Sequence, residues 1–219
     1  MGMTAGAQTR SSGRGPGFVG TGVPVAYIGP NAIIQLAAAI DRLHGHQVMR
    51  DVFDAADQAR HLDRPPARMV DELDVVALHR AGRALMGVAD FTAAAALAGS
   101  LTGDYVLQHR IPAAARTLLP RLPDFVASRV LARAIARHAW TFAGSGRFAY
   151  RFGPQGLVLT IRNPPLARSF RSPVPGCHYY AATFERIFRE LVNGRAQVSE
   201  TDCASTGTAA CRFLIRWPG

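Results

Sequence analysis

Lysine is absent from the sequence, so all 25 of its basic side chains other than histidine are arginines. We attribute this absence to a GC-rich genome. The formal net charge of +10 at pH 7 favours anionic partners, such as acidic lipid headgroups or a carboxylate ligand. The arginines are scattered along the chain, and no helix-turn-helix, zinc-finger or RNA-binding signature accompanies them. We therefore do not expect a nucleic acid partner.

Long apolar runs are missing as well. The longest, at residues 91–99, is mostly alanine and is far shorter than the roughly 20 apolar residues that span a bilayer. Residues 1–23 lack the apolar core of a secretory signal and are rich in Gly, Ser, Thr and Pro, which predicts a disordered leading segment. Residues 24–217 are enough for one domain with its own core, and we expect that domain in the cytoplasm.

Motifs for redox cofactors are scarce too. A dinucleotide-binding G-x-G-x-x-G motif lies between a strand and a helix, but the nearest stretch, GSGRFAY at residues 144–150, lacks the third glycine and leads into a predicted strand. Three cysteines are too few for the four thiolates of a [4Fe–4S] cluster. The sequence therefore shows no redox-cofactor site.

Hydrophobic periodicity predicts a helical first part of the chain. Helical spacing covers residues 31–44, 51–62, 67–85, 88–108 and 124–142. In the third of these segments, apolar and long side chains fall on one line at Met69, Leu73, Val76 and Arg80. The fourth segment is rich in alanine, so its small side chains would admit a closely packed neighbour.

After Gly146 the pattern changes to a period of two. Residues 147–152 and 157–163 alternate around a Gly-Pro-Gln-Gly turn, which predicts a hairpin. A helix over residues 179–194 and two strands, at 195–203 and 210–217, are predicted next. This order predicts an α+β fold, with N-terminal helices packed on a small antiparallel four-stranded sheet (helices-β-β-α-β-β).

Cysteine occurs only three times in the chain. Cys177 precedes the last predicted helix. Glu200 and Cys203 end the third predicted strand, and Cys211 begins the fourth. Three thiolates and one carboxylate match the four ligands of a tetrahedral structural zinc site, although His178 competes as a ligand and the cysteines also suit small buried apolar positions. The odd number of cysteines and the expected compartment disfavour a disulfide.

The spacing Cys177-x22-Glu200-x2-Cys203-x7-Cys211 resembles the pattern of the vinyl-four-reductase domain family. The resemblance implies that these four residues hold a structural zinc beside a closed apolar ligand pocket. Four protein ligands fill the coordination shell, so the ion would hold the last helix to the strands and would not take part in catalysis. The resemblance also implies the α+β fold of the vesicle-tethering subunits of the TRAPP complex, which is often dimeric, so a homodimer is one expected assembly.

The stretches YIGPNAIIQLAAAID and PGCHYYAATFERIFRELV resemble one branch of that family, which serves bacteriochlorophyll biosynthesis. The branch implies an 8-vinyl reductase, which saturates the C8 vinyl group of divinyl protochlorophyllide or chlorophyllide, with NADPH as the reductant. A carrier that delivers this magnesium tetrapyrrole to another pathway enzyme is at least as compatible with the residues. A third interpretation is a small-molecule sensor like the family's phenol-responsive activators, which would need a separate output partner.

A magnesium tetrapyrrole needs an apolar slot and can use an axial ligand for its metal ion. His138 falls on the apolar stripe of Leu131 and Ile135, so it is a candidate axial ligand that points inward. His109, near the end of the alanine-rich helix, is a second candidate. The alternative for each is an ordinary histidine with a backbone partner.

The propionate of such a ligand needs a cation. Arg162, Arg168 and Arg171 lie in or beside a proline-broken loop, and a guanidinium pairs with a carboxylate through two hydrogen bonds. The alternative is that these are solvated loop arginines. Three further arginines recur every four residues opposite the apolar stripe, at Arg129, Arg133 and Arg137. They predict a solvent face that contacts an anionic membrane, peripheral to the inner or photosynthetic membrane.

Overall fold

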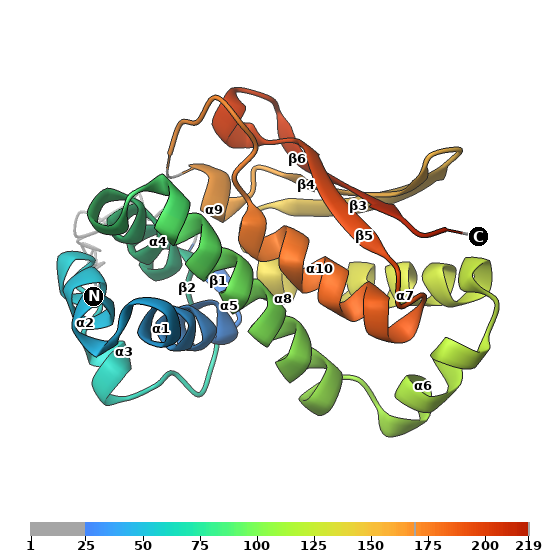
Figure 1. Ribbon diagram of the computed structural model, residues 1–219, viewed down its shortest axis with the longest axis horizontal. Helices are drawn as coiled ribbons and strands as arrows, with labels where there is room; N and C mark the ends of the chain where they lie inside the picture. The colour runs from blue at the N-terminus through green and yellow to red at the C-terminus, as the bar shows by residue number, and fades with distance from the viewer. Residues whose placement is uncertain (1–24, 169, 219) are drawn as a thin grey trace, which may run out of the picture.

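A four-stranded antiparallel sheet lies against a layer of helices in the computed structural model, which describes residues 25–168 and 170–218 (Figure 1). The helices that precede the sheet are α1 (Asn31–His44), α2 (His46–Ala55), α3 (Arg60–Asp63), α4 (Glu72–Met86), α5 (Val88–His109), α6 (Ala113–Leu118), α7 (Asp124–His138) and α8 (Trp140–Ala143). The sheet consists of β3 (Arg147–Gly153), β4 (Gly156–Arg162), β5 (Gln197–Asp202) and β6 (Ala210–Arg216), with α9 (Pro165–Arg168) and α10 (His178–Leu191) between β4 and β5. Short elements complete the chain: β1 (Tyr27–Ile28) pairs with β2 (Val70–Asp71), and 3-10 turns cover Leu119–Arg121 and Ala204–Thr206. The predicted α+β order is confirmed.

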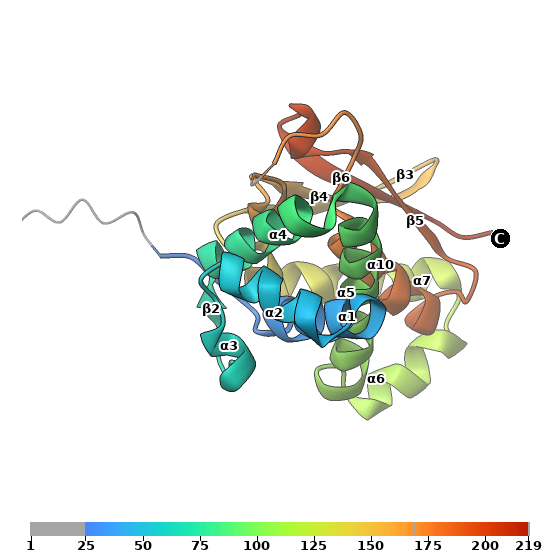
Figure 2. The same ribbon diagram turned by 60° about the vertical axis from the view of Figure 1, so that its left-hand side comes forward.

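The helices α5 and α10 lie side by side through the middle of the molecule (Figures 1 and 2). Two glycines of α5 permit this approach. A Cβ atom at Gly99 would collide with the carbonyl oxygen of Tyr179, and one at Gly103 would lie 2.7 Å from Cβ of Arg186. The Thr183 hydroxyl donates a hydrogen bond of 3.0 Å to the Gly99 carbonyl across the same contact. The close packing predicted for the alanine-rich helix is confirmed.

The sheet has the strand order β3-β4-β6-β5, and each neighbouring pair is antiparallel. Alternate residues of β4 and β6 face the helices, and the buried cross-strand pairs are Leu157 with Ile215, Leu159 with Phe213 and Ile161 with Cys211. The helix α10 covers this face, where its Phe184 ring lies 5.4 Å from the Phe213 ring. Because directly opposed residues share a face, Cys211 points into the core.

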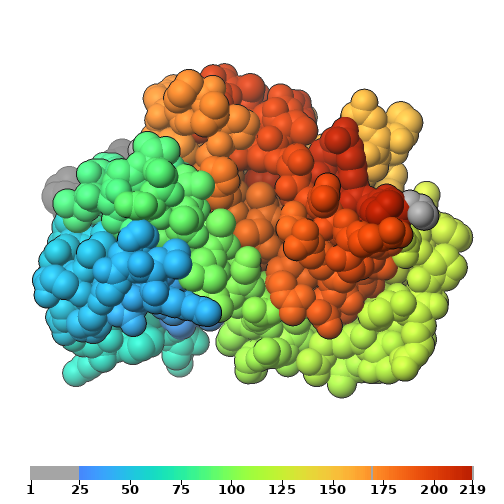
Figure 3. Space-filling model, viewed as in Figure 1, coloured from blue at the N-terminus to red at the C-terminus, as the bar shows by residue number. Residues whose placement is uncertain are grey.

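The N-terminal helices pack on the other side of α5. Ile33, Leu36 and Ile40 of α1 are buried at helical spacing. Figure 2 shows α1 and α2 in front of α5, and the space-filling view in Figure 3 shows this blue-to-green part beside the orange-to-red C-terminal part. Glu72, the first residue of α4, is buried and accepts hydrogen bonds from Ser145 and Arg168, so it connects α4 with the segments that flank the β3–β4 hairpin.

Three local expectations are wrong. Residues 51–62 are not one helix, because Asp57 has a φ of 56° and separates α2 from α3. In α4 the buried face runs through Val75 and Leu78, which leaves Leu73 64% exposed. The helix predicted for residues 124–142 ends at His138, and the separate helix α8 follows.

Within the part of the chain that the structure describes, none of the helices has the length and apolar character needed to cross a bilayer. The disordered segment predicted at residues 1–23 lies outside the described residues. The domain limits 24 and 217 stay predictions.

Candidate metal centre

The strands β5 and β6 and the start of α10 bring together four residues: Cys177, Glu200, Cys203 and Cys211. Glu200 is paired with Phe213, so it shares the core face of the sheet with Cys211, two residues before Phe213 on β6. A register shift between Glu200 and Asp202 redirects β5, and Cys203 follows it. Cys177 precedes the first turn of α10 as its N-cap residue. Residues far apart in sequence therefore meet because of strand register and helix position.

The three sulfur atoms form a compact triangle. The Sγ atoms of Cys177 and Cys211 are 3.4 Å apart, those of Cys203 and Cys211 are 3.5 Å apart, and those of Cys177 and Cys203 are 3.8 Å apart. All three cysteines are free thiols and are buried. A tetrahedral zinc ion with Zn–S bonds of about 2.3 Å holds its sulfur ligands about 3.8 Å apart. The observed spacing is therefore close to that of a zinc site.

Glu200 completes the set of four donors. One ligand atom from each of the four residues lies within 4.8 Å of all the others, and His178 is not among them. Oε2 of Glu200 accepts a hydrogen bond of 2.7 Å from the Cys177 backbone N–H, while Oε1 is buried and has no hydrogen-bond partner among the described residues. An unpaired buried carboxylate oxygen is unfavourable unless a cation binds it. Three sulfurs and one such oxygen suit zinc.

The electrostatics of the cluster also fit a cation. Burial raises the pKa of Glu200 to about 8. Hydrogen bonds from Cys177 and Cys211 lower the pKa of Cys203, and its sulfur lies 3.0 Å from the Ser205 hydroxyl. The same bonds to Cys203 and Cys211, together with burial, raise the pKa of Cys177. Negative charge is therefore concentrated on Cys203, and a divalent ion would displace protons from the other ligands as it binds.

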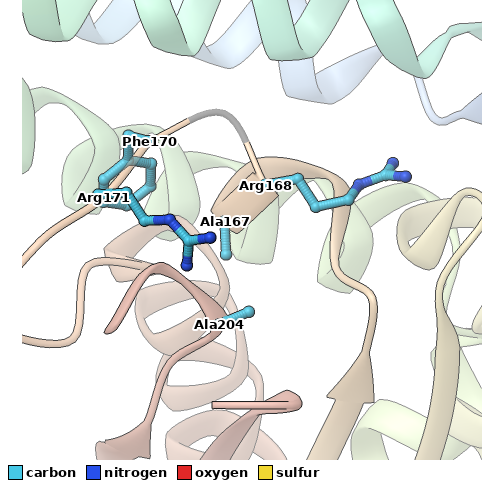
Figure 4. A pocket seen from close by; sticks show the side chains of 5 residues that line it. All are labelled: Ala167, Arg168, Phe170, Arg171 and Ala204. Atoms are coloured by element: carbon cyan, nitrogen blue, oxygen red, sulfur yellow. The ribbon is translucent and has the colours of Figure 1, made fainter. Parts of the chain in front are cut away.

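A hollow of about 470 Å³ adjoins this cluster and is lined by Ala167, Arg168, Phe170, Arg171 and Ala204 (Figure 4). Ala204 directly follows Cys203 in the chain. Figure 4 shows the Arg171 guanidinium directed toward the two alanines, whereas Arg168 extends away from them. Arg168 pairs with Glu72 at 2.5 Å, but no acidic partner of Arg171 is found among the described residues. Arg171 is thus the cation available to an anionic ligand here.

Comparison with known proteins gives the family. The model of the vinyl-four-reductase domain matches residues 157–217, which include all four residues of the cluster. The chain is 42% identical over 197 residues to the "Bacteriochlorophyll synthase 23 kDa chain" of Cereibacter sphaeroides, covering 86% of this chain and 89% of that protein. It is 39% identical over 193 residues to the protein of the same name from Rhodobacter capsulatus, covering 88% of each. The chain belongs to this family. The resemblance noted in the sequence is confirmed.

A solved structure shares the fold of this family member. An H-NOX protein from S. oneidensis in the Fe(II)NO ligation state superimposes with a TM-score of 0.56 at 11% sequence identity, covering 88% of this chain and 100% of that chain. At this identity the likeness concerns the fold alone. The expected likeness to TRAPP subunits stays a prediction.

The other predicted tetrapyrrole ligands lie away from the hollow. Arg162 is exposed at the end of β4 and does not line it. His109 is exposed at the end of α5, where its ring stacks on Tyr105 at 4.5 Å between centroids. His138 is also exposed, with Nδ1 2.9 Å from the Ala134 carbonyl oxygen, so its predicted inward direction is wrong. It lies in the last turn of α7, beyond the part of that helix whose face is buried. Binding of a ligand by these three residues stays a prediction.

Sequence reasoning missed two residues next to the cluster and the hollow. Phe170 lines the hollow, and Arg83 of α4 donates a hydrogen bond to the carbonyl of Gly176, the residue before Cys177. A signal for Arg83 is present in the sequence, because it lies one helical turn after His79 on the buried side of α4. The stripe predicted for this helix runs through Arg80 instead, so it omits Arg83.

Proposed function

We propose that this protein binds a carboxylate-bearing magnesium tetrapyrrole of bacteriochlorophyll biosynthesis and delivers it to another enzyme of the pathway. The names of its relatives support the pathway, since both are described as a chain of bacteriochlorophyll synthase. The same names support association with partner enzymes. The observation that carries the binding role is the guanidinium of Arg171, without an acidic partner among the described residues, in a hollow with an apolar wall.

The hollow has the chemistry that such a ligand requires. Phe170 and the methyl groups of Ala167 and Ala204 offer apolar contact to a macrocycle, and Arg171 offers two parallel hydrogen bonds to a propionate. Its volume of about 470 Å³ falls in the range of small-molecule sites. Arg168 contributes positive potential from its pair with Glu72. We assign the ligand's carboxylate edge to this hollow.

The metal centre is a structural zinc site in this proposal. Three thiolates and the Glu200 carboxylate would fill a tetrahedral shell, with no position left for water or substrate. The ion would hold the start of α10 to β5 and β6. Because Ala204 follows Cys203 and lines the hollow, the zinc would also fix one wall of the ligand site.

The resemblance to the vinyl-four-reductase family supports a second candidate, in which this chain itself reduces the C8 vinyl group. That reaction needs a hydride donor, and NADPH is the donor we would supply. The two candidates share the same ligand and differ in whether the bound ligand is changed.

One experiment separates them. Purified protein is titrated with divinyl protochlorophyllide, with and without NADPH, while the absorption shift and the C8 product are followed by spectroscopy and chromatography. Saturable binding without product supports the carrier, and product formation supports the reductase. Arg171→Gln should weaken binding about 10-fold, because it removes a charged pair of hydrogen bonds. Arg195→Gln, in a different arginine-lined hollow of about 620 Å³, is the matched control and should bind normally. Absence of binding by the wild-type protein would contradict both candidates.

A further inference from the structure

The guanidinium of Arg83 lies between α4 and the metal centre. Its Nη2 donates a hydrogen bond of 2.9 Å to the Gly176 carbonyl, directly before the ligand Cys177. Its Cζ lies 3.6 Å from the centroid of the Phe170 ring and 5.0 Å from that of Phe91. Arg83 therefore contacts the backbone that supplies one ligand of the cluster, from a helix that begins about a hundred residues earlier in the chain.

This cation has an incomplete set of partners. It forms no ion pair with an acidic side chain among the described residues, and its Nε is buried without a hydrogen-bond partner there. Burial lowers the pKa of Arg83, while the negative charges of Cys177, Cys203 and Glu200 oppose that shift. The electrostatic partners of Arg83 are thus the ligands of the cluster themselves.

The loaded centre needs such a cation. Three thiolates and one carboxylate around a divalent ion carry a formal net charge of −2, in a site where the three cysteines are almost fully buried. Buried charge is unfavourable unless it is paired or hydrogen-bonded. Two histidines lie nearby, but burial lowers the pKa of His79 to about 3 and also lowers the pKa of His178, so both are neutral at pH 7. Arg83 supplies a permanent positive charge at this position.

We propose that Arg83 is the counter-charge of the metal centre and the positioning residue for Cys177. Its charge offsets the negative charge of the loaded cluster, and its hydrogen bond to Gly176 holds the chain that carries the first ligand. Because Phe170 stacks on the guanidinium and also lines the hollow, Arg83 connects the ligand site with the metal centre. This inference rests on zinc binding and is independent of which tetrapyrrole the hollow accepts.

The test compares zinc affinity in three full-length variants by competition with a chelator of known affinity. Arg83→Met keeps the length of the side chain but removes its charge and donors, and it should weaken zinc binding about 10- to 100-fold. Arg83→Lys keeps the charge and should lose much less. Arg80→Met, at an exposed position on the same helix, should bind zinc as the wild type does. Cobalt-substituted protein would report whether three thiolates still bind the ion.

Thermal unfolding of loaded and metal-free protein distinguishes charge compensation from a merely structural role. Without metal, Arg83→Met should be at least as stable as the wild type, because it removes a poorly partnered buried charge. With zinc, the same variant should be less stable. Equal destabilisation of both forms, or zinc affinity within about two-fold of the wild type, would overturn the proposal.

Two further outcomes are decisive. If Arg83→Met does not fold, Arg83→Lys carries the test, and a 100-fold loss of zinc affinity in that variant would overturn the role of charge. If the wild-type protein binds no zinc, the proposal is wrong, whereas the tetrapyrrole titration can still succeed.

Discussion

Single buried side chains differ in whether the fold supplies them with a partner. Glu72 accepts hydrogen bonds from Ser145 and Arg168, so its charge is satisfied within the protein. Among the described residues, Glu200 is satisfied at one oxygen only, and Arg83 lacks an acidic partner. An unsatisfied charge in the interior indicates a missing counterpart. At this site the metal ion is the counterpart that we propose.

Cys203→Ser should remove the zinc and destabilise the fold. Loss of the ligand that carries most of the negative charge should lower the free energy of unfolding by about 3 kcal/mol or more, which is about 6–12 °C in melting temperature for a chain of this size. Metal analysis and thermal unfolding measure both effects. Ser205→Ala is the control, because Ser205 lies beside the Cys203 sulfur without being a ligand. A Cys203→Ser protein with stoichiometric zinc and unchanged melting would disprove the structural site.

Glu72 should make stability depend on acid pH. Burial alone would raise the pKa of Glu72, but the hydrogen bonds from Ser145 and Arg168 outweigh it, and the pKa lies below its usual value of 4.5. A carboxyl group with a lowered pKa in the folded state stabilises the protein above pH 4.5, and this contribution is lost as the pH falls through the folded-state pKa. Glu72→Gln should therefore be less stable at pH 7, by about 1–3 kcal/mol, and the difference should shrink below pH 4.5.

Urea unfolding at several pH values between 7 and 3 tests this expectation. Asp104→Asn, in a solvent-exposed pair with Arg186, serves as the control and should change stability little at any pH. A difference between Glu72→Gln and the wild type that stayed constant with pH would show that the charge of Glu72 is not responsible.

Among the elements, the contact between α5 and α10 decides where the metal centre lies. Cys177 directly precedes α10, so the position of that helix sets the position of one ligand. The helix can approach α5 because Gly99 and Gly103 carry no side chain at the contact. Packing of this kind tolerates little added volume.

Gly99→Ala should destabilise the protein by about 1–3 kcal/mol, because its Cβ would collide with the Tyr179 carbonyl. In an open helix the same substitution stabilises by about 0.5–1 kcal/mol, so the sign of the effect is diagnostic. Ala93→Leu, on the exposed side of α5, adds more volume and should change stability little. Chemical unfolding together with zinc content provides the measurement. A stabilised Gly99→Ala protein would show that the two helices are farther apart than described.

For the whole molecule, net charge and its distribution bear on the predicted membrane contact. The chain carries a formal charge of +10, and α7 exposes arginines beside apolar side chains such as Phe125, which is 61% exposed. Trp140, at the start of α8, is 63% exposed. Basic and aromatic residues on one face favour an anionic membrane surface. Peripheral contact and homodimer formation both stay predictions.

Vesicles containing anionic lipid should bind the protein at low salt, and neutral vesicles should not. Exchanging Arg133 and Arg137 for glutamate should reduce this binding about 10-fold or more, since each basic residue near the surface contributes about 1 kcal/mol. Exchanging Arg42 and Arg64, which are exposed on the N-terminal part, changes the net charge equally and is the control. Equal loss in both double variants would mean that net charge, and not the α7 face, drives binding.

The order of helices and strands and the four cluster residues could be predicted from the sequence, because periodicity and spacing are local properties of the chain. The β3–β4 hairpin, the close packing of α5 and the set of Cys177, Glu200, Cys203 and Cys211 belong to this class. The predictions for His138 and for the α4 stripe are wrong, since the exposed side of a helix depends on what packs against it. Periodicity limits that side to a few alternatives, and only neighbouring elements choose among them.

The sequence by itself determined the composition of the site: three thiols, one carboxylate and an excess of arginine. Only the tertiary structure decided which arginine serves which partner. Arg168 is paired with Glu72, Arg171 faces the hollow and Arg83 reaches the segment before Cys177. Electrostatic interactions depend on distance and burial in space, and the positions of residues along the chain do not specify either.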